Sequence, residues 1–334
     1  MTPHDTAQSP YFFSPKGRRW NYFKDRLVER FSELVYKVGV DAGFDCPNRD
    51  GTKAWGGCAY CSQQGSFSPH LAELKDIPSQ IERGKWFIKK RYGADKYIVY
   101  FQAFTNTYAD LETLRKRYDS ALGDPDVVGL SIASRPDCID EKIADLLQEY
   151  SERLPYFTLE LGLQSAFQNR LQWVNRQETL DDYYKAMEIL TARKVKVISH
   201  VILGFPNESS EEMLETALLA DRLGSTGIKL QMLHVIKGTK LGVMHERNPL
   251  NLLSLEEYGE NIISIVERLN PKLEIHRITG ETDNASLVAP EWVRHKTRFF
   301  DWFENQLLLR DTWQGKKFND SSAIQFQAES LATL

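Results

Sequence analysis

Three cysteines lie within sixteen residues of one another, at Cys46, Cys58 and Cys61. Three thiolates can hold a cube of four irons while leaving the fourth iron open, and an open iron can bind a ligand and support chemistry. A fourth nearby cysteine would close the cube into an electron carrier, but the remaining cysteine, Cys138, lies far along the sequence. The spacing therefore suits one iron–sulfur cluster with an open iron, and no thiols remain for a second.

Structural zinc is the alternative for the same residues. Cys58 and Cys61 have the spacing of a zinc half-site, and Cys46 with His70 could complete the set of four ligands. A disulfide framework is disfavoured, because the polar start of the chain shows no secretory signal. The local spacing leaves iron–sulfur and zinc both open, so the rest of the chain must decide.

Composition sets the broad class of the protein. A chain of 334 residues with 42% hydrophobic residues can form one large α/β domain or two smaller ones. The formal net charge of −4 excludes a chain that is basic all over, although not a local basic patch. No apolar run approaches the roughly 18 residues of a membrane span, so we expect no membrane partner. Four cysteines without a secretory signal predict a location in the reducing cytoplasm.

Short β-rich runs alternate with helix-period segments from residue 34 onward. We expect strands at 34–40, 97–103, 127–133, 156–163, 195–203 and 227–233. We expect helices at 78–92, 110–122, 140–150, 180–193, 209–223 and 255–269. Such repeats predict parallel strands with right-handed crossovers. Six units are too few for a complete eightfold barrel, so the pattern predicts an α/β fold with a partial (βα)₆ TIM-like barrel.

The segments outside these units predict the domain organisation. We expect an N-terminal leader at 1–30 and the barrel core at 31–245. A C-terminal helical extension at 246–318 would pack on the barrel, and a polar tail at 319–334 would be flexible.

The carboxyl ends of the strands are where an active site would lie in a parallel α/β barrel. Strand alternation places Glu160, Gly162 and Gln164 on one face of the fourth strand. A buried carboxylate and amide cost several kcal/mol unless polar groups surround them. This favours a ligand in the barrel lumen, with Gly162 leaving room for a flat group. The alternative is an internal layer of hydrogen bonds with water.

An ordered set of motifs at these strand ends resembles a known family. The motifs are the cysteine trio, Gln102-Ala103-Phe104, Ser134-Arg-Pro-Asp137, Glu160-Leu-Gly-Leu-Gln-Ser165, His200 with Gly204-Phe-Pro206, and Val235-Ile-Lys-Gly-Thr239. Together they resemble the radical S-adenosylmethionine (SAM) enzymes. More narrowly, they resemble the branch related to the catalytic subunit of elongator, which modifies wobble uridine in tRNA, and a bacterial group within it. The resemblance covers about residues 30–245.

The resemblance implies two cofactors and their ligands. Cys46, Cys58 and Cys61 would bind one [4Fe–4S] cluster, whose open iron would chelate SAM. One electron, from a flavodoxin- or ferredoxin-type donor, would cleave SAM and yield a 5′-deoxyadenosyl radical. The cofactor supplies this chemistry, while the protein positions it and excludes water.

The resemblance also implies contacts to SAM from the strand ends. Residues 102–104 would face the methionine amino group through their backbone, and Gln164 would be a polar contact. Arg176 would pair with the carboxylate, and His200 would lie near the ribose. Elongator-type sequences carry a glutamate where this chain has Ala133, so Glu160 is the candidate to replace that ribose contact. Elongator's catalytic subunit continues into an acetyltransferase domain, which we do not expect here.

Other residues are candidates for the substrate side of the site. Cys138, His234 and Lys237 follow the third and sixth strands and are the catalytic candidates, the alternative being packing or rim positions. Near the N-terminus, basic and aromatic residues interleave in a pattern that suits RNA binding. Those expected to contact tRNA are Arg18, Arg19, Trp20 and Lys24. A surface helix with a snorkelling basic face is the alternative there.

The sequence thus predicts a radical SAM enzyme that modifies tRNA at a wobble or anticodon-loop uridine. Within enzymes, the alternative is a protein or small-molecule substrate, including a porphyrin-like one. From another class, the alternative is a zinc-stabilised RNA-binding or regulatory protein without catalysis. The substrate prediction rests on family resemblance and on the N-terminal pattern, and fold-level analogy does not fix a substrate.

Overall fold

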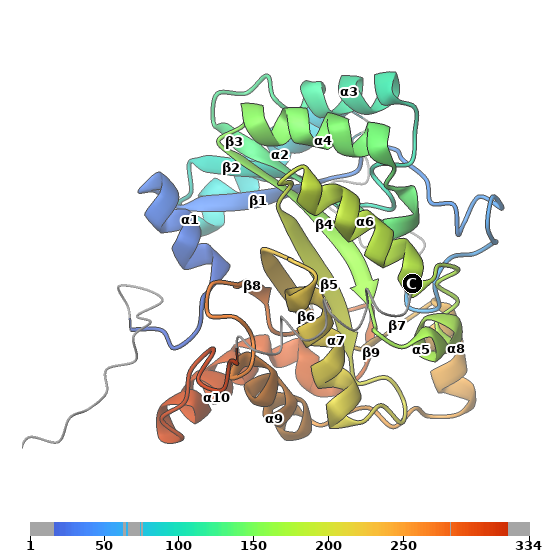
Figure 1. The fold of residues 1–334 in the computed structure, drawn as a ribbon, viewed down its shortest axis with the longest axis vertical. Helices are drawn as coiled ribbons and strands as arrows, with labels where there is room; N and C mark the ends of the chain where they lie inside the picture. Colours follow the sequence, from blue (N-terminus) through green and yellow to red (C-terminus); the bar gives the residue numbers. More distant parts are fainter. Residues whose placement is uncertain (1–16, 63–64, 66–73, 75, 281, 320–334) are drawn as a thin grey trace, which may run out of the picture.

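A sheet of seven parallel strands, curled into a half-barrel, forms the centre of the molecule (Figure 1). The computed structural model describes residues 17–62, 65, 74, 76–280 and 282–319. The expectations for His70, for residues 1–16 and for 320–334 lie outside this part. The strand order is β1-β2-β3-β4-β5-β6-β8, and each neighbouring pair is parallel, which confirms the predicted α/β partial barrel.

The predicted elements are present, and the structure adds several more. The strands are β1 Val35–Val40, β2 Lys96–Phe101, β3 Val127–Ser134, β4 Tyr156–Gln164, β5 Val197–Leu203, β6 Gly227–Met232, β7 Val235–Ile236, β8 Glu274–Arg277 and β9 Leu287–Ala289. The helices are α1 Phe23–Phe31, α2 Ile77–Tyr92, α3 Leu111–Ser120, α4 Glu141–Arg153, α5 Gln168–Trp173, α6 Leu180–Ala192, α7 Ser210–Arg222, α8 Lys240–Arg247, α9 Leu255–Val266 and α10 Lys296–Leu309. The bounds of the predicted elements differ from the observed ones by at most three residues.

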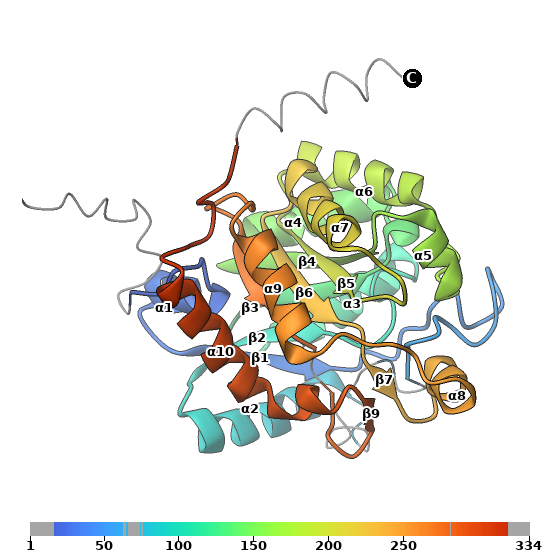
Figure 2. The same ribbon diagram turned by 90° about the horizontal axis from the view of Figure 1, so that it is seen from below.

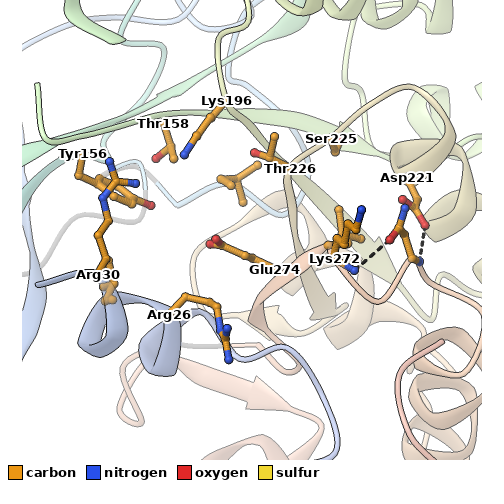
Figure 3. A pocket seen from close by; sticks show the side chains of 14 residues that line it. Arg26, Arg30, Tyr156, Thr158, Lys196, Asp221, Ser225, Thr226, Lys272 and Glu274 are labelled. Carbon is orange, nitrogen blue, oxygen red and sulfur yellow. Dashed lines mark hydrogen bonds between the residues drawn. The ribbon is translucent and has the colours of Figure 1, made fainter. Parts of the chain in front are cut away.

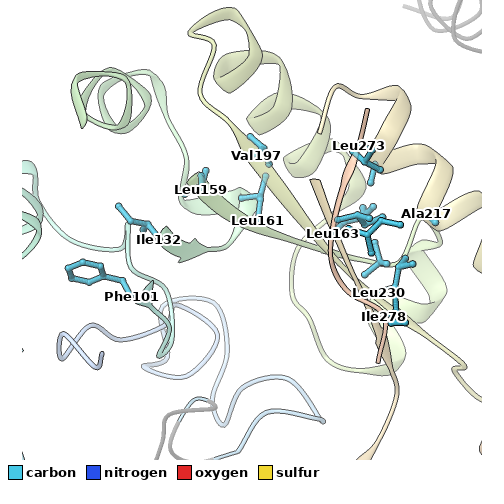
Figure 4. Packing of buried hydrophobic residues seen from close by; sticks show 14 of the residues in the cluster. Phe101, Ile132, Leu159, Leu161, Leu163, Val197, Ala217, Leu230, Leu273 and Ile278 are labelled. Carbon is cyan, nitrogen blue, oxygen red and sulfur yellow. The ribbon is translucent and has the colours of Figure 1, made fainter. Parts of the chain in front are cut away.

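The core lies between the sheet and the helices that cover its outer face. On β4, Leu159, Leu161 and Leu163 point into this core, where they are at most 1% exposed (Figure 4). The alternate residues of β4 therefore face the lumen, as the period-2 pattern predicted. Side-chain caps fix where the helices begin: Asp140 accepts a hydrogen bond from Ile143 N at the start of α4.

The segment after residue 246 contributes to the sheet as well as to the surface. Its four-residue strand β8 pairs with β6 and becomes the seventh strand. α9 packs beside α7, and α10 packs on α9 (Figure 2). The C-terminal segment therefore completes the barrel wall and then covers it with helices.

The N-terminal segment is part of the core. α1 packs against both β1 and β8, where Phe23 stacks on His276 with ring centroids 3.8 Å apart. The Trp20 indole is fully buried, and its ring lies edge-on to Phe303. The tRNA contact expected at Trp20 is inconsistent with a ring that is fully buried. Its neighbours Arg18 and Arg19 form ion pairs within the protein.

A cavity of about 360 Å³ lies beneath α1, at the amino ends of the strands (Figure 3). Side chains of both charges line it, among them Arg30, Lys196, Asp221 and Glu274. It lies at the opposite end of the sheet from the cysteine loop, so it is separate from the candidate active site. In the described part of the chain, no helix is long and apolar enough to cross a membrane.

Candidate active site

The cysteine loop follows β1 at the carboxyl edge of the sheet. Cys61 N donates a hydrogen bond to Cys58 O at 3.0 Å, which closes a turn between two of the sulfurs. Gly51 has a φ of 92°, and a Cβ there would lie 2.3 Å from the Trp55 ring, so glycine is required at this position. Cys46 and Cys58 are buried and Cys61 is half-buried, and all three are free thiols.

Three polar side chains lie against the sulfurs. Asn48 Nδ2 is 3.4 Å from Cys58 Sγ and also donates to Asn175 O at 2.7 Å. Arg176 Nη1 is 3.8 Å from the same sulfur. Arg49 Nη1 is 3.9 Å from Cys61 Sγ. These donors suit sulfurs that carry negative charge, as cluster ligands do.

The buried sulfurs fit a cationic metal group. Burial and the neighbouring Cys58 raise the pKa of the Cys61 thiol to about 11, although Arg49 acts in the opposite direction. A metal group would stabilise the thiolates that burial disfavours. Two buried polar atoms nearby, Asn48 Oδ1 and Arg135 Nη1, lack a hydrogen-bond partner among the described residues. A polar ligand at this edge would satisfy them.

The zinc alternative requires ligands that converge on a single ion. Among the residues that the structure describes, no three His, Cys, Asp or Glu side chains are grouped tightly enough to hold one ion. A [4Fe–4S] cluster needs a wider arrangement, because each thiolate binds a different iron. One of the zinc ligands considered from the sequence, His70, lies outside the described residues.

The residues after β2 are held in place by a buried asparagine. Asn106 Nδ2 lies 3.0 Å from Phe101 O, Ala103 O and Ala133 O, which ties the end of β2 to β3. Phe104 has a φ of 60°, so the chain turns sharply there. The Gln102 side chain packs on Gly39 of β1. The predicted contact of residues 102–104 with SAM stays a prediction, but these residues do lie at the edge that carries the cysteines.

Gly162 brings two predicted SAM contacts together. A Cβ at Gly162 would lie 2.4 Å from Gln164 Nε2 and 2.6 Å from Arg176 Nη2. Both side chains therefore pack directly over this glycine, and Arg176 also reaches Cys58. Gln164 has a φ of 64°, and the register of β4 against β5 shifts between residues 162 and 164. This irregularity accompanies the packing of the Gln164 amide beside Arg176 over Gly162.

Sequence reasoning missed an ion network that holds Arg176. Arg176 Nε donates to Glu178 Oε1 at 2.5 Å, and Arg135 Nη2 lies 3.2 Å from Glu178 Oε2. Arg135 also forms a bidentate pair with Asp137 at 2.8 Å for both bonds. All four side chains are buried. The network links the loops after β3 and α5 and fixes the guanidinium beside the cysteine loop.

Glu160 is the centre of a polar cluster in the lumen. Its Oε1 accepts hydrogen bonds from Lys37 Nζ at 2.5 Å and from Ser131 Oγ at 2.9 Å. Its Oε2 accepts from His200 Nε2 at 2.7 Å and from Lys229 Nζ. These residues come from β1, β3, β4, β5 and β6, so the internal layer of hydrogen bonds considered from the sequence is present. The carboxylate is fully engaged within the protein, and its contact with a ribose stays a prediction.

The cluster shifts the protonation of its members. Burial raises the pKa of Glu160, but Lys229 and Lys37, with the His200 hydrogen bond, hold it well below its ordinary value. Burial and the Lys229 charge lower the pKa of His200 to about 4, although Glu160 opposes this. Burial lowers the pKa of Lys229 to about 7, again against Glu160. At neutral pH, His200 is therefore a neutral donor, and Lys229 is close to its pKa.

The three catalytic candidates have different environments. Cys138 is near the cysteine loop, and burial and Asp137 raise the pKa of its thiol, so it stays protonated. Half-buried His234 donates from Nδ1 to Met232 O at 2.9 Å, which leaves Nε2 as an acceptor, and burial lowers its pKa. Lys237 is exposed. Their catalytic roles stay predictions.

The fold and the cysteine loop define a class, and comparison with known proteins agrees. The radical SAM superfamily matches residues 48–220, and the radical SAM C-terminal domain matches residues 225–308. Because the first match spans more than half of the chain, the protein belongs to the radical SAM superfamily and is an enzyme. Its cofactors are therefore a [4Fe–4S] cluster and SAM. The matched region includes Cys58 and Cys61 and begins just after Cys46.

Two individual proteins are similar in sequence to this chain. The protein YtqA of Bacillus subtilis is 37% identical over 310 residues, which is 93% of this chain and 96% of YtqA. The tRNA uridine(34) acetyltransferase of Methanocaldococcus jannaschii is 28% identical over 196 residues, 58% of this chain and 33% of that protein.

A solved structure supports the same fold. The structure of archaeal Elp3 from Methanocaldococcus infernus superposes with a TM-score of 0.62 at 19% identity. The superposition covers 81% of this chain and 63% of Elp3, so the chain spans a little under two thirds of it. At this identity the likeness concerns the fold alone.

Proposed function

We propose that the enzyme modifies tRNA at a wobble or anticodon-loop uridine. The observation that carries the proposal is the similarity of the barrel to the tRNA uridine(34) acetyltransferase of Methanocaldococcus jannaschii. The shared fold with archaeal Elp3 supports it. A uridine that is flipped out of a loop could enter the lumen, since RNA enzymes act on bases taken out of the stack.

The residues of this chain would position the cofactors at the carboxyl edge of the sheet. Cys46, Cys58 and Cys61 would ligate the cluster, while Arg176 and Gln164 would bind SAM over Gly162. When bound, the cluster supplies the electron that cleaves SAM reductively to a 5′-deoxyadenosyl radical.

The lumen below this edge supplies polar groups for a substrate. Glu160 stays ionised and orients the His200 ring through Nε2. Lys229, with a pKa lowered to about 7 by burial, can take up or release a proton at Nζ near neutral pH. Glu160 and Lys229 are buried, so bulk water does not reach them, which would protect reactive intermediates beside them.

Comparison of tRNA nucleosides from a deletion strain and its parent tests the proposal. We expect one uridine derivative to disappear or to be replaced by its precursor. The wild-type gene should restore it, and a gene carrying Cys58→Ala should not. An unchanged nucleoside profile would contradict the tRNA assignment.

A further inference from the structure

Helix α2 presents aromatic side chains to solvent. The exposed fractions are 59% for Trp86 and 43% for Tyr92. The opposite face of α2 packs on the barrel, where a Cβ at Gly84 would lie 2.4 Å from Val38 Cγ1 of β1. The core therefore uses one face of the helix, and the exposed rings belong to the other. A contiguous patch of exposed apolar groups rimmed by charges marks an interaction surface, whereas a single exposed ring does not.

The same helix is rich in cations. Its basic residues are Arg83, Lys85, Lys89, Lys90 and Arg91. Acidic residues already pair with Lys85 and Lys89. Lys90 Nζ instead lies 5.0 Å from the Trp86 ring centroid, and the Arg91 guanidinium lies 5.4 Å from that of Tyr92. Within the described ranges, no carboxylate pairs with Lys90 or Arg91, so their charges remain available to a ligand.

This surface continues across β1 to α1. Tyr36 of β1 stacks on Tyr92 with ring centroids 4.7 Å apart and planes 16° apart. Lys24 of α1 lies 4.9 Å from the Tyr36 ring centroid. β1 is the edge strand of the sheet, with α1 and α2 both packed against it (Figures 1 and 2). We call Lys24, Tyr36, Trp86, Lys90, Arg91 and Tyr92 the basic–aromatic surface.

We propose that the basic–aromatic surface binds the RNA substrate outside the lumen. Lys90 and Arg91 would contact phosphates, and Trp86 would stack on a base, as alternating cations and rings do in proteins that bind single-stranded RNA. The proposal rests on the proposed function, because it needs an RNA substrate. Charge complementarity favours RNA over a second copy of this chain, whose matching surface would carry the same positive charge.

The position of the surface suits a large substrate. α2 follows the cysteine loop along the chain, so its first turn at Ile77 is nearest to that loop. Because α2 then runs back toward the amino ends of the strands, where β2 begins, Trp86 lies about 14 Å and Arg91 about 21 Å from this turn, at 1.5 Å per residue. A folded RNA is much longer than these distances. Its body can rest on α2 and the β1 edge while one unpaired base reaches the lumen.

Fluorescence anisotropy with labelled bulk tRNA from the deletion strain tests the surface. The double variant Lys90→Glu/Arg91→Glu should weaken binding about ten-fold or more and reduce the slope of log K against log salt by about 1.5. Trp86→Ala should weaken binding about ten-fold without changing this slope. The matched control Lys142→Glu/Lys185→Glu reverses two exposed charges on α4 and α6 and should bind like wild type.

The outcomes separate this proposal from the tRNA assignment. All variants should keep wild-type iron content and RNA-independent SAM cleavage. If the strain comparison shows a modified uridine but Lys90→Glu/Arg91→Glu binds tRNA like wild type, only the surface proposal is wrong. A variant that binds tRNA normally but loses self-association, or reduction by flavodoxin, would also overturn it. An unchanged nucleoside profile would contradict the tRNA assignment and therefore also this proposal, which depends on it.

Discussion

Gly162 and Arg176 lie against each other at the carboxyl edge of the sheet, where a Cβ at Gly162 would come within 2.6 Å of Arg176 Nη2. The contact joins the strand that faces the lumen to the loop that carries the cysteines, because Arg176 Nη1 also approaches Cys58 Sγ. The absence of a Cβ at Gly162 therefore leaves the space that the Arg176 guanidinium occupies beside the cysteine loop.

Gly162→Ala should weaken SAM binding by about ten-fold, the effect of losing one charged contact. The new methyl would push aside the ends of the Gln164 and Arg176 side chains, which move more easily than backbone, so the fold should persist. Titration of the reconstituted protein with SAM would measure this. Gly123→Ala is the control, since a Cβ there meets nothing within 4 Å. Equal SAM affinity in both variants would refute the assigned contacts.

Asn48→Ala should reduce the iron bound after anaerobic reconstitution. The amide donates to Asn175 O and lies against Cys58 Sγ, so its loss leaves a buried carbonyl unpaired and loosens the cysteine loop. The cost should be about 1–3 kcal/mol of local stability. Asn261→Ala, which removes a solvent-exposed hydrogen bond within α9, should keep wild-type iron content. Full iron content in Asn48→Ala would show that this residue does not support the loop.

His200→Gln should flatten the loss of stability in acid. The folded pKa of His200 is about 4, below its ordinary value of 6.5, so between these values the unfolded chain binds more protons. Wild-type stability from this group is complete above pH 6.5 and falls toward pH 4. Glutamine keeps a donor for Glu160 and does not titrate.

Urea denaturation of the apoprotein at pH 7 and pH 5 measures this difference. Between the two values, wild type should lose about 2 kcal/mol more than the variant. Burial also lowers the pKa of His276 to about 4. Because His276 titrates in both proteins, its effect drops out of the difference between wild type and variant. Parallel pH profiles would mean that folding does not lower the pKa of His200.

Trp20→Ala should lower the free energy of unfolding by about 3–5 kcal/mol, as the loss of a buried aromatic ring does. Trp86→Ala should change it by no more than about 0.5 kcal/mol, because that ring is exposed. Urea denaturation curves distinguish the two. Similar stabilities for both variants would contradict the burial of Trp20.

Period-2 alternation predicted which β4 residues face the lumen, and strand-end motifs predicted the edge that carries the site. The sequence also contained a signal for the polar cluster in the lumen that was overlooked. Lys229 interrupts the otherwise apolar start of β6, and Lys37 does the same in β1. Lysines at alternate positions of buried strands indicate an internal carboxylate partner, here Glu160.

Other features depend on contacts distant in sequence. β8 reads Glu-Ile-His-Arg, and its single fully buried residue, Ile275, gives no apolar run to recognise. Asn48 donates a hydrogen bond to Asn175 O, which is more than one hundred residues away in the sequence. Trp20 and Trp86 both lie in basic–aromatic stretches, and only the packing of α10 against Trp20 separates a core residue from a surface one.

The central claim is that Cys46, Cys58 and Cys61 hold one cluster that cleaves SAM. Anaerobic reconstitution followed by iron analysis and reduction in the presence of SAM tests it most directly. We expect about four irons per chain, release of 5′-deoxyadenosine, and loss of both in Cys58→Ala. Protein that carries one zinc and no iron, or Cys58→Ala that still cleaves SAM, would contradict it.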